Sequence, residues 1–215
     1  MAEPAGTRPA EAAAAAGPLG RGRALLAAAV EVEAERNRLV EAVRRSHRCR
    51  ISEAVAQVDG CVDTLVRWAG WSDKLDLLLP AATTGRRPPT VAVLAPPDLL
   101  GTTRALGSAL AAGARCVLAH DSAAVGALAV LLAAEFGDGA VSVVDRDPGT
   151  VRGAVAGVSL LDARAATARE FDAPLRLACA AAGTRVLAPL PAQELRATGD
   201  LDLVAALFTG AATTV

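Results

Sequence analysis

Between residues 90 and 144, short β-branched runs alternate with alanine- and leucine-rich segments, and this alternation restricts the fold more than any other feature. Three apolar runs are typical of buried strands, at residues 90–95, 115–119 and 140–144. The segments between them predict helices that end at glycines, at residues 100–112 and 123–136. Strands and helices that alternate at this spacing favour right-handed parallel βαβ units. We therefore expect an α/β fold, with a Rossmann-like parallel sheet flanked by helices.

The pattern beyond Asp145 is weaker. Apolar runs predict two further strands, at residues 155–161 and 184–188. Helical spacing predicts three further helices, at residues 163–171, 175–182 and 201–208.

An amphipathic helical segment precedes the sheet. Residues 21–45 carry apolar side chains at helical spacing with charges on the other face, which predicts one helix. A break is expected at residues 46–50, followed by a second helix at residues 51–70. Ser52 is the candidate N-cap of that helix and Gly70 its candidate end. Its predicted inner face consists of Val55, Val58, Val62, Leu65 and Val66.

The chain of 215 residues is long enough for one substantial core. The proline-rich stretch at residues 80–89 is the expected boundary between a helical segment, residues 21–79, and a Rossmann-like unit, residues 90–215. Residues 1–20 are rich in alanine, proline and glycine and carry scattered charge. We interpret them as a disordered tail rather than a targeting peptide.

Charge and cysteine content exclude several classes of function. A net charge of −1 gives no reason to expect nucleic acid or an anionic membrane as a partner, and it is compatible with self-association. The longest apolar run, at residues 123–134, is too short to span a bilayer. The four cysteines form no Cys-x-x-Cys pair and only His47 and His120 accompany them, so zinc-site spacing is absent. Unpaired cysteines of this kind favour a reducing, cytoplasmic location.

Both tryptophans lie in the stretch Trp-Ala-Gly-Trp-Ser-Asp-Lys at residues 68–74. This stretch resembles the "aromatic-Ala-Gly-Trp-Ala-Asp-Lys" segment of the aldehyde dehydrogenase superfamily. Further segments are similar to that family in the same order, at residues 23–29, 53–68, 91–96, 109–113 and 136–144. The resemblance covers the family's early helices and the first half of its NAD(P)-binding domain, and it implies a truncated, degenerate homologue.

The first departure from the family follows the strand at residues 90–95. The resemblance places Pro96 in a vestigial cofactor pocket. Asp98 stands where the family has the Asn whose side chain stabilises the oxyanion, and a carboxylate would repel that charge. Alternatively, Asp98 is the N-cap of the following helix, which is the interpretation we favour.

Other departures concern the cofactor and the catalytic centre. Ala119 and Ser122 stand at the positions of the family's ribose-binding Lys and Glu, and His120 and Asp121 between them do not reproduce that ribose contact. We interpret Asp121-Ser122 as a loop and helix cap. No glycine-rich turn opens a helix after Val158. The stretch at residues 184–189 lacks the family's general base, and the nucleophilic Cys of the family lies in a further domain. Cys179 has no neighbouring His or acidic partner, which predicts a buried helical cysteine. Phe208-Thr-Gly-Ala repeats the letters of the family's phosphate-facing turn, which we interpret as coincidence.

Three functions are compatible with these residues. The first, which we favour, is a pseudoenzyme that binds a full-length aldehyde dehydrogenase or another copy of itself, with no catalytic residues, no metal and at most weak NAD(P) binding. The second is an NAD(P)-dependent aldehyde oxidoreductase subunit that contributes part of a cofactor site to a heteromeric enzyme. The third is a nucleotide or small-ligand sensor, which the fold alone does not exclude.

Overall fold

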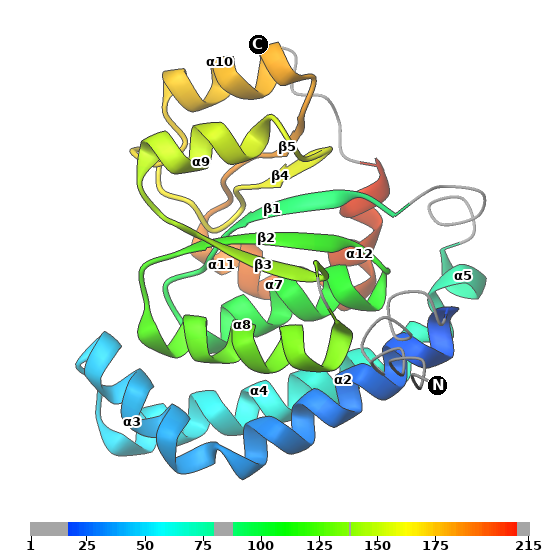
Figure 1. Ribbon diagram of the computed structural model, residues 1–215, viewed down its shortest axis with the longest axis vertical. Coiled ribbons are helices and arrows are strands. Elements are labelled where there is room, and N and C mark those ends of the chain that lie inside the picture. Colours follow the sequence, from blue (N-terminus) through cyan, green and yellow to red (C-terminus); the bar gives the residue numbers. More distant parts are fainter. Residues whose placement is uncertain (1–16, 80–87, 138, 210–215) are drawn as a thin grey trace, which may run out of the picture.

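The computed structural model describes residues 17–79, 88–137 and 139–209. Within these residues a five-stranded parallel sheet has the strand order β3-β2-β1-β4-β5 (Figure 1). The strands are β1 (Thr90–Leu94), β2 (Arg115–His120), β3 (Val141–Asp145), β4 (Leu160–Asp162) and β5 (Arg185–Leu187). The predicted fold class is confirmed, and β1 to β3 lie where the apolar runs predict them.

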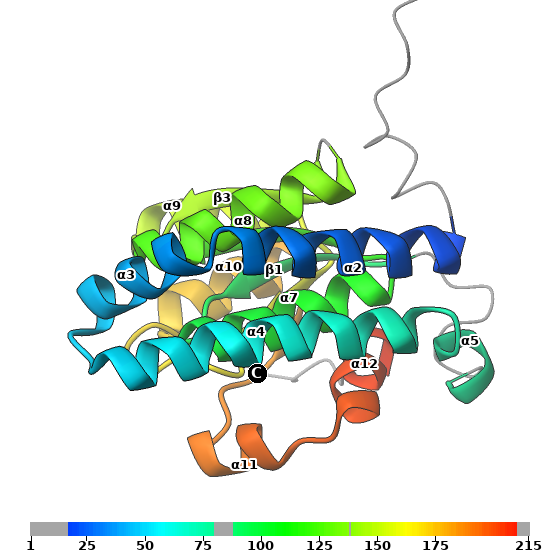
Figure 2. The same ribbon diagram turned by 90° about the horizontal axis from the view of Figure 1, so that it is seen from below.

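Helices cover both faces of the sheet. Their bounds are α2 (Gly17–Ala34), α3 (Arg36–His47), α4 (Ile51–Ser72), α5 (Leu75–Leu78), α7 (Leu99–Ala111), α8 (Ala123–Phe136), α9 (Pro148–Val155), α10 (Ala173–Ala182), α11 (Ala192–Ala197) and α12 (Asp200–Thr209). Figure 1 shows α7 and α8 on one face of the sheet and α9 and α10 on the other. On the α7/α8 side, α2 and α4 lie side by side in a further layer (Figure 2).

The central strand β1 is buried on both faces, and its side chains enter two cores. Val91 and Val93 belong to the larger core, which also holds buried residues of α2, α4, α7, α8 and α12. Ala92 and Leu94 belong to the smaller core, beneath α9 and α10. A strand covered on both faces reads as a continuous apolar run, which is why the sequence predicts β1 well. The helical segment and the sheet therefore share one core.

The N-terminal helical segment differs from the prediction in its breaks. The single helix expected at residues 21–45 is divided into α2 and α3 at Glu35, whose φ and ψ are −90° and 12°. Residues 17–20, predicted as part of the tail, form the first turn of α2, while residues 1–16 lie outside the described residues. Arg48, with a φ of 50°, follows the end of α3 in the left-handed conformation.

The ends of α4 also differ. Arg50, not Ser52, is its N-cap residue, because the Glu53 carboxylate accepts the backbone N–H of Arg50 at 3.3 Å. The helix continues past Gly70 to Ser72, where the Lys74 ammonium donates to the Gly70 carbonyl at 2.7 Å. Val66, predicted on the inner face, is exposed because it lies on the outer side of the α2–α4 layer.

The helices α4 and α7 approach closely because small residues lie between them. A Cβ atom at Gly107 of α7 would lie 2.5 Å from Cδ1 of Trp68, which is 1% exposed. Farther along the contact, Thr103 donates its hydroxyl to the Cys61 sulfur at 3.0 Å. Trp68 therefore fills the close contact between α4 and α7, whereas Trp71 is only partly buried against the core.

Two predictions beyond Asp145 differ from the structure. The strand expected at residues 155–161 forms only at its end, as β4, and Val155 is instead the last residue of α9. Asp147 caps α9 and Pro148 occupies its first position, although the sequence pattern predicts no helix there. The helix expected at residues 163–171 does not form. Instead, the carboxylates of Asp162 and Glu170 accept the backbone N–H groups of Arg164 and Thr167, which holds the segment in turns. The later predictions of α10, β5 and α12 are confirmed within about two residues.

The fit of Trp68 against α7 gives a first prediction. We expect Gly107→Ala to lower the free energy of unfolding by about 1–3 kcal/mol, because the added methyl group overlaps the indole ring. A matched control is Gly70→Ala, where nothing lies within 4 Å of the new methyl group. That change is expected to stabilise α4 by about 0.5–1 kcal/mol. Urea denaturation of the three proteins measures both effects, and equal stabilities would contradict the close contact.

Candidate functional site

A cleft of about 370 Å³ lies at the carboxyl ends of the central strands. Its walls come from the loop after β1, the first turns of α7, the segments after β4 and β5, and residues of α11 and α12. In open parallel sheets, ligands bind outside the carboxyl ends of the strands, where the strand order reverses direction. Here that point lies between β1 and β4, so the cleft is the candidate functional site.

The lining of the cleft is mainly leucine, proline and alanine. Its charged members are three arginines and two aspartates, namely Arg104, Arg164, Arg196, Asp98 and Asp162. The described residues that line the cleft include no Cys, His, Ser, Thr, Lys or Glu. Such a lining is suited to holding an apolar molecule near a cationic rim, and it offers no nucleophile of the usual kinds.

Asp162 and Arg164 form a buried ion pair in the wall of the cleft. Asp162 is the last residue of β4, and the two residues are 5% and 6% exposed. The Arg164 guanidinium donates to both carboxylate oxygens, with distances of 2.9 Å and 2.7 Å. A bidentate pair of this kind satisfies the carboxylate, so Asp162 has little capacity left to act as a base.

Asp98 is the N-cap of α7, as the favoured interpretation predicts. Its Oδ1 atom accepts the backbone N–H of Gly101 at 2.6 Å. Pro96 lines the cleft, and its carbonyl accepts the Thr102 hydroxyl at 3.3 Å. The loop after β1 therefore bonds to the first turn of α7, and the predicted role of Pro96 in cofactor binding stays a prediction.

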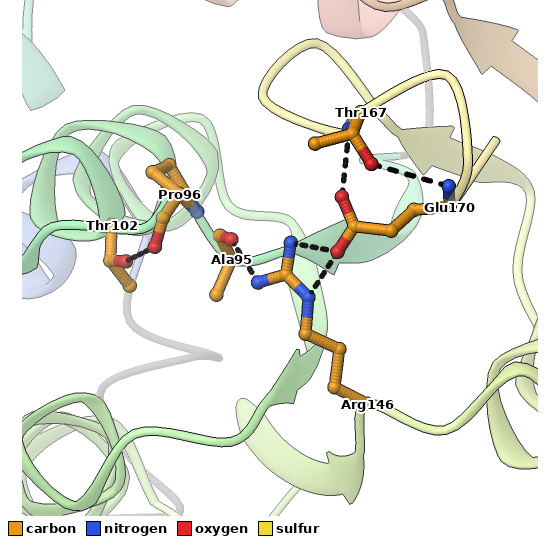
Figure 3. Close-up of polar contacts among 6 residues, drawn as sticks. All are labelled: Ala95, Pro96, Thr102, Arg146, Thr167 and Glu170. Carbon is orange, nitrogen blue, oxygen red and sulfur yellow. Dashed lines mark hydrogen bonds and ion pairs between the residues drawn. The ribbon is translucent and has the colours of Figure 1, made fainter. Parts of the chain in front are cut away.

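The guanidinium of Arg146 lies at the carboxyl end of β1, between Ala95 and Glu170 (Figure 3). Its guanidinium donates to the Ala95 carbonyl and, through Nε, to Glu170 at 2.7 Å. Glu170 also accepts the backbone N–H of Thr167 at 2.7 Å. Burial raises the pKa of Glu170, but the hydrogen bonds from Thr167 and Arg146 outweigh it and hold the pKa below its usual value.

The last residue of β2 and the loop after it contain polar atoms without partners. Both ring nitrogens of His120 and the Ser122 hydroxyl are buried and make no hydrogen bond within the described part of the chain. The His120 ring lies close to α8, where a Cβ at Gly126 would be 3.0 Å from Cε1. Ser122 is the N-cap residue of α8 but its side chain makes no capping bond. Ala119 is buried in the smaller core.

The three buried cysteines are poor candidates for nucleophiles. Cys179 is 2% exposed in α10, as predicted, and burial raises its pKa. Burial also raises the pKa of Cys61 and of Cys116 to about 12. A thiol with a raised pKa is protonated at neutral pH and reacts slowly.

Sequence reasoning did not identify Arg146, Glu170, Asp162 or Arg164. Arg146 follows directly after β3, and a charged residue at the carboxyl end of a parallel strand is a signal that could have found it. Glu170 lies in the segment 163–171, for which the sequence pattern predicts a helix that does not form. In the turns observed instead, the Glu170 carboxylate accepts the backbone N–H of Thr167.

The described residues form neither a metal-binding cluster nor a membrane-spanning helix. No three His, Cys, Asp or Glu side chains in them are grouped so as to hold a metal ion. None of the helices they form is both long and apolar enough to cross a bilayer. Of the Phe208-Thr-Gly-Ala letters, Phe208 is buried within α12 and the last two residues lie outside the described ranges.

The role of Asp98 can be tested by two substitutions. We expect Asp98→Ala to lower the free energy of unfolding by about 1 kcal/mol, because α7 loses its capping acceptor. Asp98→Asn should leave the stability nearly unchanged, since an amide oxygen caps equally well. Thermal unfolding compares the three proteins. An Asn variant as unstable as the Ala variant would show that the negative charge, not the cap, matters.

The lowered pKa of Glu170 predicts a pH-dependent contribution to stability. Because the pKa of the folded protein lies below that of the unfolded chain, the ionised group stabilises the fold above the unfolded pKa of about 4.3. This contribution is lost as the pH falls through the folded pKa. Wild type should be more stable than Glu170→Gln at about pH 7, and the difference should shrink below about pH 4. A difference that stays constant in urea titrations across this range would contradict the assignment.

Comparison with known proteins places this geometry in a known fold. The sequence matches no protein-family profile and no curated protein. Among solved structures, NAD-dependent aldehyde dehydrogenase from Sinorhizobium meliloti is similar, with a TM-score of 0.63 and 18% identity over 83% of this chain and 40% of that chain. A putative aldehyde dehydrogenase from Burkholderia cenocepacia gives a TM-score of 0.64 and 22% identity, over 83% of this chain and 42% of that chain.

Betaine aldehyde dehydrogenase from Staphylococcus aureus in complex with NAD+ is also similar. Its TM-score is 0.63 and its identity 14%, over 83% of this chain and 39% of that chain. At these identities the likeness concerns the fold. The chain has the fold of part of an aldehyde dehydrogenase and spans about 40% of the length of these enzymes.

Proposed function

We propose that the chain is a non-catalytic aldehyde dehydrogenase-like protein, a pseudoenzyme that acts by binding a protein partner. One observation carries the proposal, namely the composition of the cleft. Both of its carboxylates are engaged within the chain, Asp98 by the start of α7 and Asp162 by Arg164. The described lining offers no other acid, base or nucleophile, so binding is the activity that this cleft supports best.

The residues at the carboxyl edge of the sheet do not fit a dinucleotide well. Arg146 and Glu170 form an ion pair against the end of β1. The turn after β4 holds a buried ion pair where a glycine-rich turn would let a phosphate approach. Buried Ala119 cannot hold a ribose hydroxyl. These features support at most weak NAD(P) binding as part of the proposal.

The proposed partner is a full-length aldehyde dehydrogenase. The chain has the fold of part of such enzymes, which makes a related full-length chain the partner that we propose. Large apolar side chains are exposed at separate places, including Val143 on the edge strand β3 and Leu177 on α10, at 48% and 67%. A cytoplasmic location belongs to the same proposal, because unpaired cysteines suit a reducing compartment.

A second candidate is a subunit that contributes part of a cofactor site to a heteromeric NAD(P)-dependent aldehyde oxidoreductase. The cleft itself favours it, because its position at the switch point of the sheet is where cofactors bind in such folds. Arg196 at its rim is exposed and has no ion-pair or hydrogen-bond partner among the described residues, so it is free to meet an anionic group.

Calorimetric titration separates the two candidates. For the pseudoenzyme we expect no binding of NAD or NADP tighter than about 1 mM. A complete aldehyde dehydrogenase titrated under the same conditions serves as the positive control. Tighter binding by this chain would favour the cofactor-site subunit and count against the pseudoenzyme.

The partner is tested by co-expression. The tagged full chain is expected to co-purify with a complete aldehyde dehydrogenase of the same source in a fixed stoichiometric ratio. An unrelated tagged protein of similar size provides the control for non-specific capture. Recovery of the chain without the enzyme, under conditions where both are folded, would contradict the proposed partner.

A further inference from the structure

One side of α2 carries an exposed stripe in which two apolar residues lie between opposite charges. The stripe consists of Arg23, Leu26, Val30 and Glu33, spaced three or four residues apart on the same side of the helix. Leu26 and Val30 are 47% and 66% exposed. We call these four residues the α2 stripe.

The α2 stripe lies on the outermost layer of the molecule, where α2 and α4 run side by side (Figure 2). The two helices are antiparallel, since Gly22 lies against Ala69 and Arg36 pairs with Asp59. Leu26, one turn along α2 from Gly22, is therefore level with Val66 of α4, which is 47% exposed. The α2–α4 layer thus exposes an apolar side chain on each helix at this level.

The order of charges along the stripe makes it complementary to itself. If a second α2 lies antiparallel about a twofold axis at Ala28, Leu26 faces Val30 of the second copy and Arg23 faces its Glu33. The Arg23–Glu33 pair is then attractive, and the twofold axis makes it occur twice. A parallel arrangement would instead place each charge against its like.

Arg23 and Glu33 are both available for an ion pair with a second chain. Arg23 is exposed and has no ion-pair or hydrogen-bond partner in the part of the chain that the structure describes. Glu33 pairs with Arg36 at 3.2 Å, and its side chain is 56% exposed, so one carboxylate oxygen remains available. Arg36 also pairs with Asp59, so it keeps a partner when Glu33 turns to another cation.

We propose that the α2 stripe is a docking surface for a second copy of this chain, which binds through an antiparallel, twofold-symmetric α2–α2 contact. The surface is small, so the dimer is weak, with a dissociation constant on the order of micromolar. This contact concerns identical chains and does not depend on the proposed dehydrogenase partner.

Charge reversal at two positions tests the proposal on the full chain. Arg23→Glu places like charges together twice in the homodimer, and so does Glu33→Arg. Each variant alone should weaken self-association about tenfold or more, because two attractive pairs become repulsive. An equimolar mixture of the two variants should restore it, since each chain then meets an opposite charge. The double variant should also associate like wild type. Sedimentation equilibrium measures all four samples.

Two further variants serve as controls. Leu26→Glu should dissociate the dimer by placing a charge at its centre, whereas Val143→Glu on the distant edge strand should leave association unchanged. Circular dichroism and the thermal midpoint establish that every variant is folded. A wild-type chain that remains monomeric at about 100 µM would overturn the proposal. Charge reversals without effect, a mixture that stays monomeric, or dissociation by Val143→Glu would overturn it as well.

Discussion

The contact between α4 and α7 joins the helical segment to the sheet, and the position of the candidate site depends on it. Gly107 leaves room for the Trp68 ring, and Gly60 leaves room for Leu100. Gln57 of α4 accepts the backbone N–H of Leu99 at 3.0 Å, which fixes the first turn of α7. Because that turn forms one wall of the cleft, the helices before the sheet help to shape a site at its carboxyl edge.

At that edge most of the charged side chains near the cleft and β1 pair with other groups of the chain. Asp98 bonds α7, Asp162 bonds Arg164, and Arg146 joins the end of β1 to the turn that contains Glu170. In a parallel sheet these are the positions from which side chains usually reach a ligand. Here the same positions hold neighbouring segments together, so the groups that would otherwise recognise a ligand stabilise the fold.

The sequence predicts the first three strands and α7 and α8 because each follows one strong rule. Strand β1 is a continuous apolar run, and Gly113 and Gly137 follow α7 and α8 with φ values of 82° and 92°. Beyond Asp145 the strands shorten to three residues, too few to show a period. In the turns after β4, backbone N–H groups bond to side chains instead of to other backbone groups, as Thr167 does to the Glu170 carboxylate.

In the candidate site, too, the features that depend on neighbouring residues are predictable from the sequence, and those that depend on distant residues are not. The capping role of Asp98 follows from local sequence, because a cap acts on residues three positions away. The pair of Arg146 and Glu170 joins positions 24 residues apart and depends on how β3 and the turns meet β1. No local pattern contains that information.

The buried cysteines lie in three different layers, with Cys61 in α4, Cys116 in β2 and Cys179 in α10. Each thiol is shielded by the layer it belongs to and reacts only when that layer opens. The unmodified chain thus carries a separate chemical reporter in its outer helices, in its sheet and in its opposite helical face. The sequence in which these thiols become modifiable would reveal the sequence in which the layers detach.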